Sequence, residues 1–328
     1  MLVDHFGRRI NYLRIAVTDR CNLRCVYCLP QSGVHWQPLQ DQLTVDEIVQ
    51  VATTAAQLGV ERIRLTGGEP LVHPHIVEIV AHLATIPGIQ EVSLTTNGML
   101  LERLASPLAN AGLKRVNVSL DTLDADKFTR ITRGGNIDRV WRGIAAAEAA
   151  QLAPLKLNTV VVKGLNSDEL PALARLTIDR PWHIRFIELM PIGNAQDWGD
   201  GFPKLPDRYL PVKDIRACLD AYELRPELPP QGNGPARTFR IPGAQGTVGF
   251  ISPVGEHFCQ ACNRLRLTAD GFLRPCLLKE GEINVREALR AGSSLSPFFQ
   301  QAVESKPQCH ELFLDHVSHV RHMAQIGG

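Results

Sequence analysis

Six of the eight cysteines fall in two short groups whose spacing is typical of metal ligands. The first group, Cys21, Cys25 and Cys28, has the spacing C-x3-C-x2-C. Three thiolates this close can converge on one soft metal centre. Three ligands to a four-iron cluster leave one iron open to bind another molecule, whereas a structural zinc site needs a fourth ligand, for which His35 is a candidate.

The second group is Cys259, Cys262 and Cys276, with the spacing C-x2-C-x13-C. It also holds only three cysteines, one fewer than the usual ligands of a zinc ribbon. The nearby His257 could complete a zinc site. The alternative is a second iron–sulfur cluster with one open iron, to which a substrate could bind directly.

Several cations are predicted to face one cavity. Two pairs lie in predicted strands with one residue between their members, so each pair points to one face of its strand. The cations concerned are Arg14, Arg62, Arg64, Lys156, Arg264 and Arg266. In a chain with a formal net charge of only +1, a polyphosphate substrate explains such a concentration better than unrelated surface ion pairs.

Strands and helices alternate along the first part of the chain, which predicts a parallel sheet. The predicted strands cover residues 12–17, 62–65, 92–95, 115–120, 155–162 and 183–188. A helix over 44–58 begins at a capping box formed by Thr44 and Glu47. Polar residues follow every strand, which favours a barrel-like sheet with its site on that face. A doubly wound sheet is the competing topology, but its usual glycine fingerprint is absent.

Composition sets broad limits on the class of protein. The chain has 328 residues, 44% hydrophobic and 21% charged, which is typical of a globular protein. Its near-neutral charge predicts neither a nucleic-acid nor a membrane partner. The N-terminus has no signal-peptide pattern and no apolar run could span a bilayer, so we expect a cytoplasmic protein.

Two cysteines lie outside the groups. Cys218 is predicted to be a core residue on a helix over 215–221. Cys309 stands beside His310 and could bind metal, although such an isolated pair more often has no such role.

The first cysteine motif, with Tyr27 before its last cysteine, resembles the signature of the radical S-adenosylmethionine superfamily. Gly67-Gly68-Glu69-Pro70, after the second strand, is similar to a second element of that superfamily. Further blocks extend the resemblance over nearly the whole chain, to the family that cyclises GTP in molybdenum cofactor biosynthesis. They include 12–14, 95–98, 117–121, 158–160, 185–190, 258–266 and the terminal Gly327-Gly328.

The resemblance implies an incomplete (β/α)6 TIM-like barrel over residues 1–190, closed by a C-terminal domain over 191–328. It implies a first [4Fe-4S] cluster on Cys21, Cys25 and Cys28 and a second on Cys259, Cys262 and Cys276. Contacts to S-adenosylmethionine are implied for Tyr27, Gly68, Ser119 and Met190. Contacts to GTP are implied for Arg14, Arg64, Thr95, Lys156, Arg264, Leu265 and Arg266. The flexible tail Gly327-Gly328 is expected to enter the active site and help catalysis.

The implied reaction is a radical cyclisation. A 5′-deoxyadenosyl radical takes hydrogen from C3′ of GTP, and the carbon radical attacks C8 of guanine. The product is (8S)-3′,8-cyclo-7,8-dihydroguanosine 5′-triphosphate, which a cyclic pyranopterin monophosphate synthase takes in the next step. An unidentified electron donor is required, and a homodimer is one open assembly.

Two other functions remain open at this point. One is a peptide-modifying radical enzyme with an auxiliary cluster, which usually carries more cysteines in its C-terminal region. The other is a non-catalytic metal-binding protein, which predicts about one zinc per chain instead of two iron–sulfur clusters.

Overall fold

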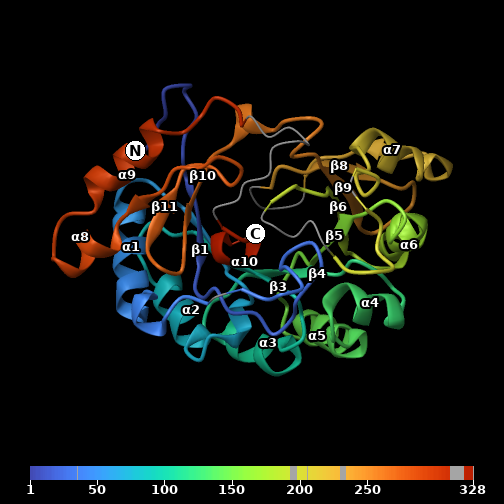
Figure 1. The fold of residues 1–328 in the computed structure, drawn as a ribbon, viewed down its shortest axis with the longest axis horizontal. Coiled ribbons are helices and arrows are strands. Elements are labelled where there is room, and N and C mark those ends of the chain that lie inside the picture. The colour runs from blue at the N-terminus through green and yellow to red at the C-terminus, as the bar shows by residue number, and fades with distance from the viewer. Residues whose placement is uncertain (35, 193–197, 205, 230–233, 311–320, 328) are drawn as a thin grey trace.

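The computed structural model consists of a single mixed sheet with helices along its outer side (Figure 1). It describes residues 1–328 except 35, 193–197, 205, 230–233, 311–320 and 328. The strands are β1 (Tyr12–Ala16), β2 (Arg62–Thr66), β3 (Glu91–Thr96), β4 (Arg115–Ser119), β5 (Lys156–Val161), β6 (His183–Glu188), β7 (Arg225–Pro226), β8 (Arg237–Arg240), β9 (Thr247–Ile251), β10 (Arg264–Leu267), β11 (Phe272–Arg274) and β12 (Ile283–Asn284). The α-helices are α1 (Val45–Gln57), α2 (Ile76–Ala84), α3 (Leu101–Asn110), α4 (Ala125–Thr132), α5 (Ile137–Ala149), α6 (Leu170–Asp179), α7 (Val212–Ala217), α8 (Arg286–Arg290), α9 (Ser296–Glu304) and α10 (Met323–Ile326). Short 3-10 turns are η1 (Leu39–Asp41), η2 (Pro70–Val72), η3 (Ser167–Glu169), η4 (Asp220–Tyr222) and η5 (Cys259–Ala261).

Strands β1 to β6 lie side by side in chain order, and every neighbouring pair among them is parallel. This order confirms the six predicted strands, with ends that differ by no more than one or two residues. It excludes the doubly wound topology, in which the strand order reverses at a switch point. The carboxyl ends of all six strands therefore meet at one edge, where the predicted polar segments lie.

The C-terminal part of the chain extends the same sheet at both edges. Strand β10 pairs in parallel with β1, and β9 pairs in parallel with β6. Strands β11 and β12 continue beyond β10 in antiparallel pairs, as do β8 and β7 beyond β9. The sheet thus begins with β12 and ends with β7.

Alternation along β2 illustrates how the sheet divides core from cavity. Ile63 and Leu65 are fully buried in the main hydrophobic core, together with Ile48 of α1. Successive strand residues point to opposite faces, so Arg64 faces the inner side of the sheet. Helix α1 begins at the predicted capping box, in which the Thr44 hydroxyl accepts from the Glu47 backbone and the Glu47 carboxylate accepts from Thr44.

One prediction outside the site is wrong. Cys218 is exposed, not a core residue. Helix α7 ends at Ala217, and its buried face is formed by Val212 and Ile215, so Cys218 lies at the C-cap on the solvent side. Among the residues that the structure describes, no helix is long and apolar enough to cross a membrane.

Candidate active site

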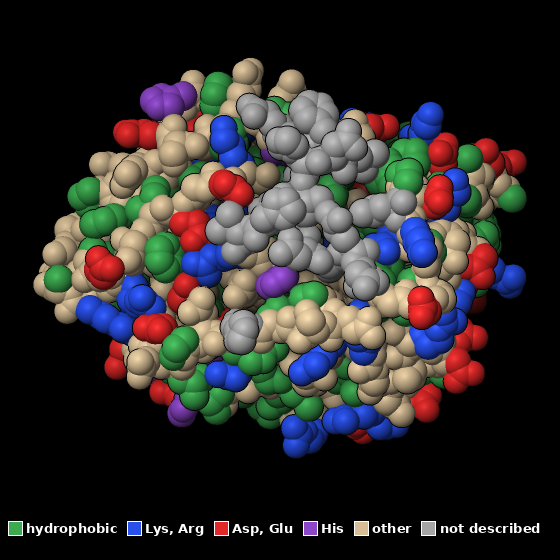
Figure 2. All heavy atoms as spheres, viewed as in Figure 1, with side chains coloured by type: hydrophobic (Ala, Val, Ile, Leu, Met, Phe, Trp, Pro, Cys, Tyr) green, Lys and Arg blue, Asp and Glu red, His purple; other side chains and the backbone are tan. Residues whose placement is uncertain are grey.

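A cavity opens at the carboxyl ends of β1 to β6. Its lining combines residues from these strand ends with C-terminal residues such as Phe258, Leu277 and Met323. Around the rim of this face, basic and acidic side chains are interspersed (Figure 2), as expected for a chain of net charge +1. The positive charge that could select a ligand lies inside the cavity.

The first cysteine group lies in the loop after β1, and all three cysteines line the cavity. The backbone of the Gly67-Gly68-Glu69 segment is hydrogen-bonded to the segment that leads to Cys21. The Gly68 N–H donates to Thr18 O at 2.8 Å, and the Glu69 N–H donates to Arg20 O at 2.8 Å. A Cβ on Gly68 would collide with Arg20 O, so the glycine permits this close approach of two backbones. The two predicted motifs therefore form one structural unit.

Glu69 extends this unit to the next strand. Its buried carboxylate accepts from the Thr96 hydroxyl at 2.7 Å and from the Asn97 backbone at 2.7 Å. The Asn97 side chain donates to Asn22 at 2.8 Å, beside Cys21. Burial raises the pKa of Glu69 to about 7, although these hydrogen bonds oppose the rise. Glu69 thus positions the loops of β2 and β3 against the cysteine loop.

Tyr27 fixes the other side of the cysteine loop. Its hydroxyl donates to Asp121 Oδ2 at 2.6 Å, and Asp121 Oδ1 accepts from the Val160 backbone at 2.8 Å. Tyr27, Gly68, Ser119 and Met190, the predicted contacts to S-adenosylmethionine, all line the cavity. The structure therefore brings these four residues to the same wall as the cysteines.

The first cysteine group fits an iron–sulfur cluster by its donor chemistry. All three thiols are free, and the donors are sulfur only, without the histidine or carboxylate typical of harder metals. The Leu23 backbone N–H points at Cys21 Sγ at 3.4 Å. Burial raises the pKa of Cys21 to about 11 and of Cys28 to about 12, so metal binding must displace their protons.

The register of three neighbouring strands aligns three arginines in a row. Arg14 is opposite Arg266 on one side and opposite Arg64 on the other. Neighbouring strands are ~4.8 Å apart, so the backbones of the three arginines are separated by about this distance from one strand to the next. All three line the cavity, and Thr95, also predicted to contact substrate, lines it too. We refer to Arg14, Arg64 and Arg266 as the arginine row.

Arg185 is a cavity residue that was not among the predicted substrate contacts. Its Nε and Nη2 atoms are buried and have no hydrogen-bond partner within the described part of the chain, and the same holds for Nε of Arg264. Both guanidinium groups line the cavity. Burial lowers the pKa of Arg185 to about 9. This value is still above 7, so the guanidinium is charged at neutral pH. The available signal was a charged residue between the apolar Ile184 and Phe186 in a buried strand.

Two residues that were predicted to contact the substrate, Lys156 and Leu265, do not line the cavity. Lys156 is buried but does not line the cavity; it lies two residues before Asn158, which does. Burial lowers the pKa of Lys156 to about 6, and the charges of Arg185 and Arg115 add to this effect. Leu265 is fully buried in the hydrophobic core, between Arg264 and Arg266, which line the cavity.

The second cysteine group lies near Arg264 and Arg266. Cys259 begins η5, Cys262 is its C-cap, and Cys276 follows β11. The buried Lys306 ammonium is 3.7 Å from Cys262 Sγ. Burial raises the pKa of Cys262, but the charges of Lys306 and Arg264 outweigh this effect, and the pKa is lower than usual.

Free thiols with N–H donors nearby again fit a thiolate-bound metal centre. The Leu278 N–H points at Cys276 Sγ at 3.4 Å. Cys276 also packs with Met190 against a small apolar cluster that contains Ile326. These contacts join the second group to the cavity wall.

The C-terminal tail reaches the arginine row. The Gly327 carbonyl accepts a hydrogen bond from the Arg266 guanidinium. Gly327 has φ +68°, and a Cβ there would collide with the Thr66 hydroxyl. The predicted entry of Gly328 lies outside the described residues.

Comparison with known proteins gave matches over the whole chain. The Radical SAM superfamily model matches residues 15–177, and the Molybdenum Cofactor Synthesis C model matches 182–312. The GTP 3′,8-cyclase of Moorella thermoacetica is 52% identical, with 99% of each chain covered. That of Pelotomaculum thermopropionicum is 50% identical at the same coverage. A Listeria monocytogenes GTP 3′,8-cyclase is 47% identical over 100% of this chain and 99% of its own.

A solved structure shares the fold at low identity. Streptococcus suis SuiB bound to S-adenosylmethionine aligns with a TM-score of 0.60 and 15% identity, over 90% of this chain and 68% of that chain. This likeness supports the α/β radical enzyme fold and nothing more specific.

Proposed function

Since the chain belongs to the GTP 3′,8-cyclase family of radical S-adenosylmethionine enzymes, we propose that it converts GTP to (8S)-3′,8-cyclo-7,8-dihydroguanosine 5′-triphosphate, the first step of molybdenum cofactor biosynthesis. Family membership argues against a non-catalytic metal-binding protein. It also argues against a peptide-modifying enzyme, because the relatives that match over the whole chain are named GTP 3′,8-cyclase.

The arginine row beside the first cysteine group is the observation that supports this function most strongly. The arginine row comes from three adjacent strands and lines a cavity that the first cysteine group also lines. Arg185 and Arg264 line the same cavity. Among the described residues, Arg185 Nε, Arg185 Nη2 and Arg264 Nε are buried and have no hydrogen-bond partner. Buried charge of this kind is costly unless an anion compensates it. A nucleoside triphosphate supplies that compensation and is the substrate named for the relatives.

The residues of the cavity have separate tasks in this proposal. The arginine row, Arg185 and Arg264 bind the triphosphate and fix its direction. Tyr27, Gly68, Ser119 and Met190 hold S-adenosylmethionine beside the first cysteine group. Thr95 orients the ribose, and the wall formed by Phe258, Leu277 and Met323 excludes water from the space between the two ligands.

Cofactors supply the difficult bond breaking. S-adenosylmethionine and a [4Fe-4S] cluster held by Cys21, Cys25 and Cys28 supply the radical that takes hydrogen from the ribose. A second cluster would be held by Cys259, Cys262 and Cys276 and would bring the guanine base close to iron. Lys306 and Arg264 stabilise thiolate charge at this second site. The protein itself provides orientation and a closed, dry space.

The wider organisation follows from the same reasoning. We take the sheet to be an incomplete (β/α)6 barrel over residues 1–190, closed by a domain over 191–328 that carries the second cluster. A cyclic pyranopterin monophosphate synthase is the expected consumer of the product, and an electron donor must reach the clusters. We expect the triphosphate to lie along the arginine row, next to Gly327, whose carbonyl accepts a hydrogen bond from Arg266.

An anaerobic assay tests the proposed function. The protein is reconstituted with iron and sulfide, reduced, and supplied with S-adenosylmethionine, with GTP, ATP or no nucleotide. We expect GTP-dependent formation of 5′-deoxyadenosine together with the cyclised nucleotide. Cleavage that is indifferent to GTP would retain the radical enzyme but contradict the substrate, and a fully iron-loaded protein without cleavage would contradict both.

A further inference from the structure

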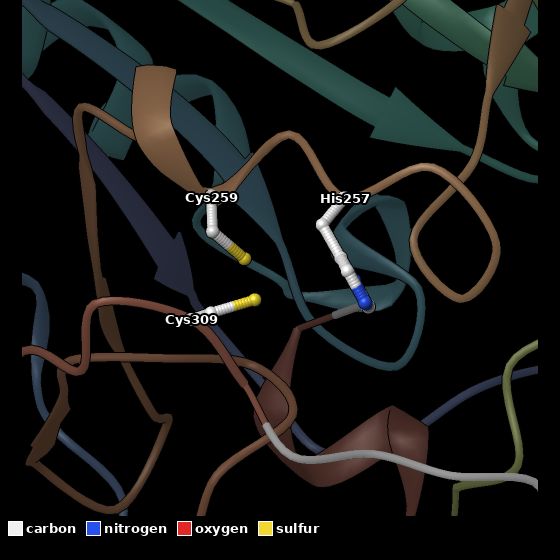
Figure 3. A group of neighbouring side chains, drawn as sticks. All are labelled: His257, Cys259 and Cys309. Carbon is white, nitrogen blue, oxygen red and sulfur yellow. The ribbon is translucent and has the colours of Figure 1, made fainter.

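Next to the second cysteine group lies a set of donor atoms that the proposed clusters do not use. Among the described residues, His257, Cys259 and Cys309 bring three donor atoms within 4.8 Å of one another. The sulfurs of Cys259 and Cys309 point toward each other, and His257 extends from the loop that precedes η5 (Figure 3). Cys309 comes from a segment fifty residues farther along the chain than Cys259.

This distance suits a single ion better than a cluster. In a four-iron cluster each cysteine binds a different iron, so the ligand sulfurs stand farther apart than they do around one ion. Two thiolates and one imidazole are a typical zinc donor set, with a fourth position left open. Zinc also prefers such mixed sulfur and nitrogen ligands over the oxygen donors of calcium or magnesium.

The chain holds these ligands together without a metal. The Arg8 guanidinium donates to Cys259 O at 2.7 Å, and it also donates to Pro307 O at 2.7 Å and to Gln308 O at 3.2 Å. Arg8 is itself fixed by Asp4, at 2.6 Å. One buried side chain therefore joins the turn that carries Cys259 to the segment that carries Cys309.

His310 completes the surroundings of the group. Its backbone N–H donates to Cys259 Sγ. Its Nε2 atom lies 3.1 Å from Nδ1 of His257, and the two rings are 4.5 Å apart between centroids. Metal-binding histidines are commonly oriented by a hydrogen bond through the second ring nitrogen, and His310 can orient His257 in this way.

We propose that His257, Cys259 and Cys309 form a mononuclear Zn²⁺ site that shares Cys259 with the second cysteine group. Both centres draw on the Cys259 thiolate, and a cluster needs its ligand sulfurs farther apart than one ion does, so we take the zinc ion and the second cluster to be alternatives at this end of the molecule. This exclusivity rests on the proposed function, whereas the zinc site itself does not. A chain without the second cluster would hold zinc, which would keep Cys259 and Cys309 bound and the η5 turn joined to the 307–310 segment.

Cobalt(II) replaces zinc in a test with an optical signal. The full-length protein is purified without iron and titrated anaerobically with Co²⁺, and thiolate-to-cobalt charge transfer is recorded. Every protein in the test carries Cys21→Ala, Cys25→Ala and Cys28→Ala, so that the first cysteine group cannot bind cobalt; this triple variant is the parent. The variants added to the parent are Cys309→Ala, Cys309→Ser and Cys262→Ala, with Cys218→Ala as the control for loss of an exposed cysteine. Circular dichroism checks that each variant is folded.

We expect one Co²⁺ per chain in the parent, in Cys262→Ala and in Cys218→Ala. In both Cys309 variants the affinity for Co²⁺ should fall. The fall should exceed the ~10–100-fold loss that is typical when a residue supporting a metal ligand is replaced. Unchanged binding in the Cys309 variants, or loss of the signal in Cys262→Ala, would overturn the site, because the ion would then lie on the second cysteine group.

Zinc loading before iron reconstitution tests the exclusivity. The zinc-loaded parent, which lacks the first cysteine group, should take up about four fewer iron atoms per chain than the zinc-free parent, which corresponds to one cluster. Cys309→Ala in the same background should take up the full amount with or without zinc. Full iron uptake with zinc retained would overturn the exclusivity and leave the assay for GTP turnover unaffected. A Cys309 variant that cannot form the second cluster would instead assign Cys309 to the cluster and overturn the zinc site.

Discussion

Replacement of Arg185 by methionine should have opposite effects on folding stability and on GTP binding. The change removes the charge and keeps most of the apolar stem. Arg185 Nε and Nη2 have no hydrogen-bond partner among the residues that the structure describes. A buried polar group without a partner costs ~1–3 kcal/mol. Arg185→Met should therefore raise the free energy of unfolding by about 1–2 kcal/mol, which corresponds to a few degrees in Tm.

The same substitution should weaken GTP binding. A hydrogen bond to a charged group contributes ~1.5–3 kcal/mol, so the Kd for GTP should rise by about 10- to 150-fold. Calorimetric titration of GTP into reconstituted protein, without S-adenosylmethionine or reductant, measures binding without turnover. Thermal unfolding of the same preparations measures stability.

Arg175→Met is the matched control, because Arg175 is exposed on α6, the helix before β6. It removes the same charge and should change neither quantity by more than about 0.5 kcal/mol. Equal Kd values for the two variants would refute the role of Arg185 in triphosphate binding. A less stable Arg185→Met protein would show that the guanidinium supports the fold, and the reasoning from its unpartnered atoms would then be wrong.

Three further predictions concern other parts of the site. Burial lowers the pKa of Lys156 to about 6. Lys156 does not line the cavity, so a triphosphate bound at the nearby Arg185 should raise this pKa only through space; GTP binding should then take up part of a proton, and its affinity should fall as pH rises from 6 to 8. Calorimetry in buffers of different ionisation enthalpy measures that proton, which Lys156→Met should lose and the exposed Lys163→Met should keep. Cys262→Ala should still cleave S-adenosylmethionine but lose productive GTP turnover; full cyclisation by this variant would contradict the role given to the second cysteine group. Gly327→Ala should displace the tail from the arginine row and lower the ratio of cyclised product to 5′-deoxyadenosine. The control Gly292→Ala has a similar φ of +69° with open space around it, and it should leave this ratio unchanged. Equal ratios in the two variants would contradict a role for the tail.

The sequence predicted the elements of the sheet better than their lateral arrangement. Alternation and turn residues gave the six strands, and spacing gave the pairs of arginines within single strands. Neither could place Arg266 beside Arg14, because that contact depends on β10 pairing in parallel with β1 across some 250 residues. Register between distant strands is set by the whole fold, so a local pattern cannot predict it.

The interpretation of Gly67-Gly68-Glu69 from sequence was incomplete for a similar reason. The glycines were expected to admit a ligand, and they line the cavity. Their backbone also hydrogen-bonds to Thr18 and Arg20, contacts that only the folded chain creates. Glu69 received no role from spacing, yet its carboxylate joins the loop after β2 to the loop after β3. The motif that contains Glu69 could not show this positioning role, because the partners lie in another loop of the folded chain.

The arginine row also bears on what the C-terminal half contributes. Strand β10 supplies Arg266, and its neighbours Arg264 and Phe258 line the same cavity as the first cysteine group. If the C-terminal half only covered a finished barrel, the whole arginine row would lie on the first six strands. Here one of its three arginines comes from a strand that pairs directly with β1, so the proposed substrate site is complete only when both halves of the chain have joined one sheet. Changes that weaken the β1–β10 pairing should therefore lower GTP binding before they affect the loop that carries Cys21.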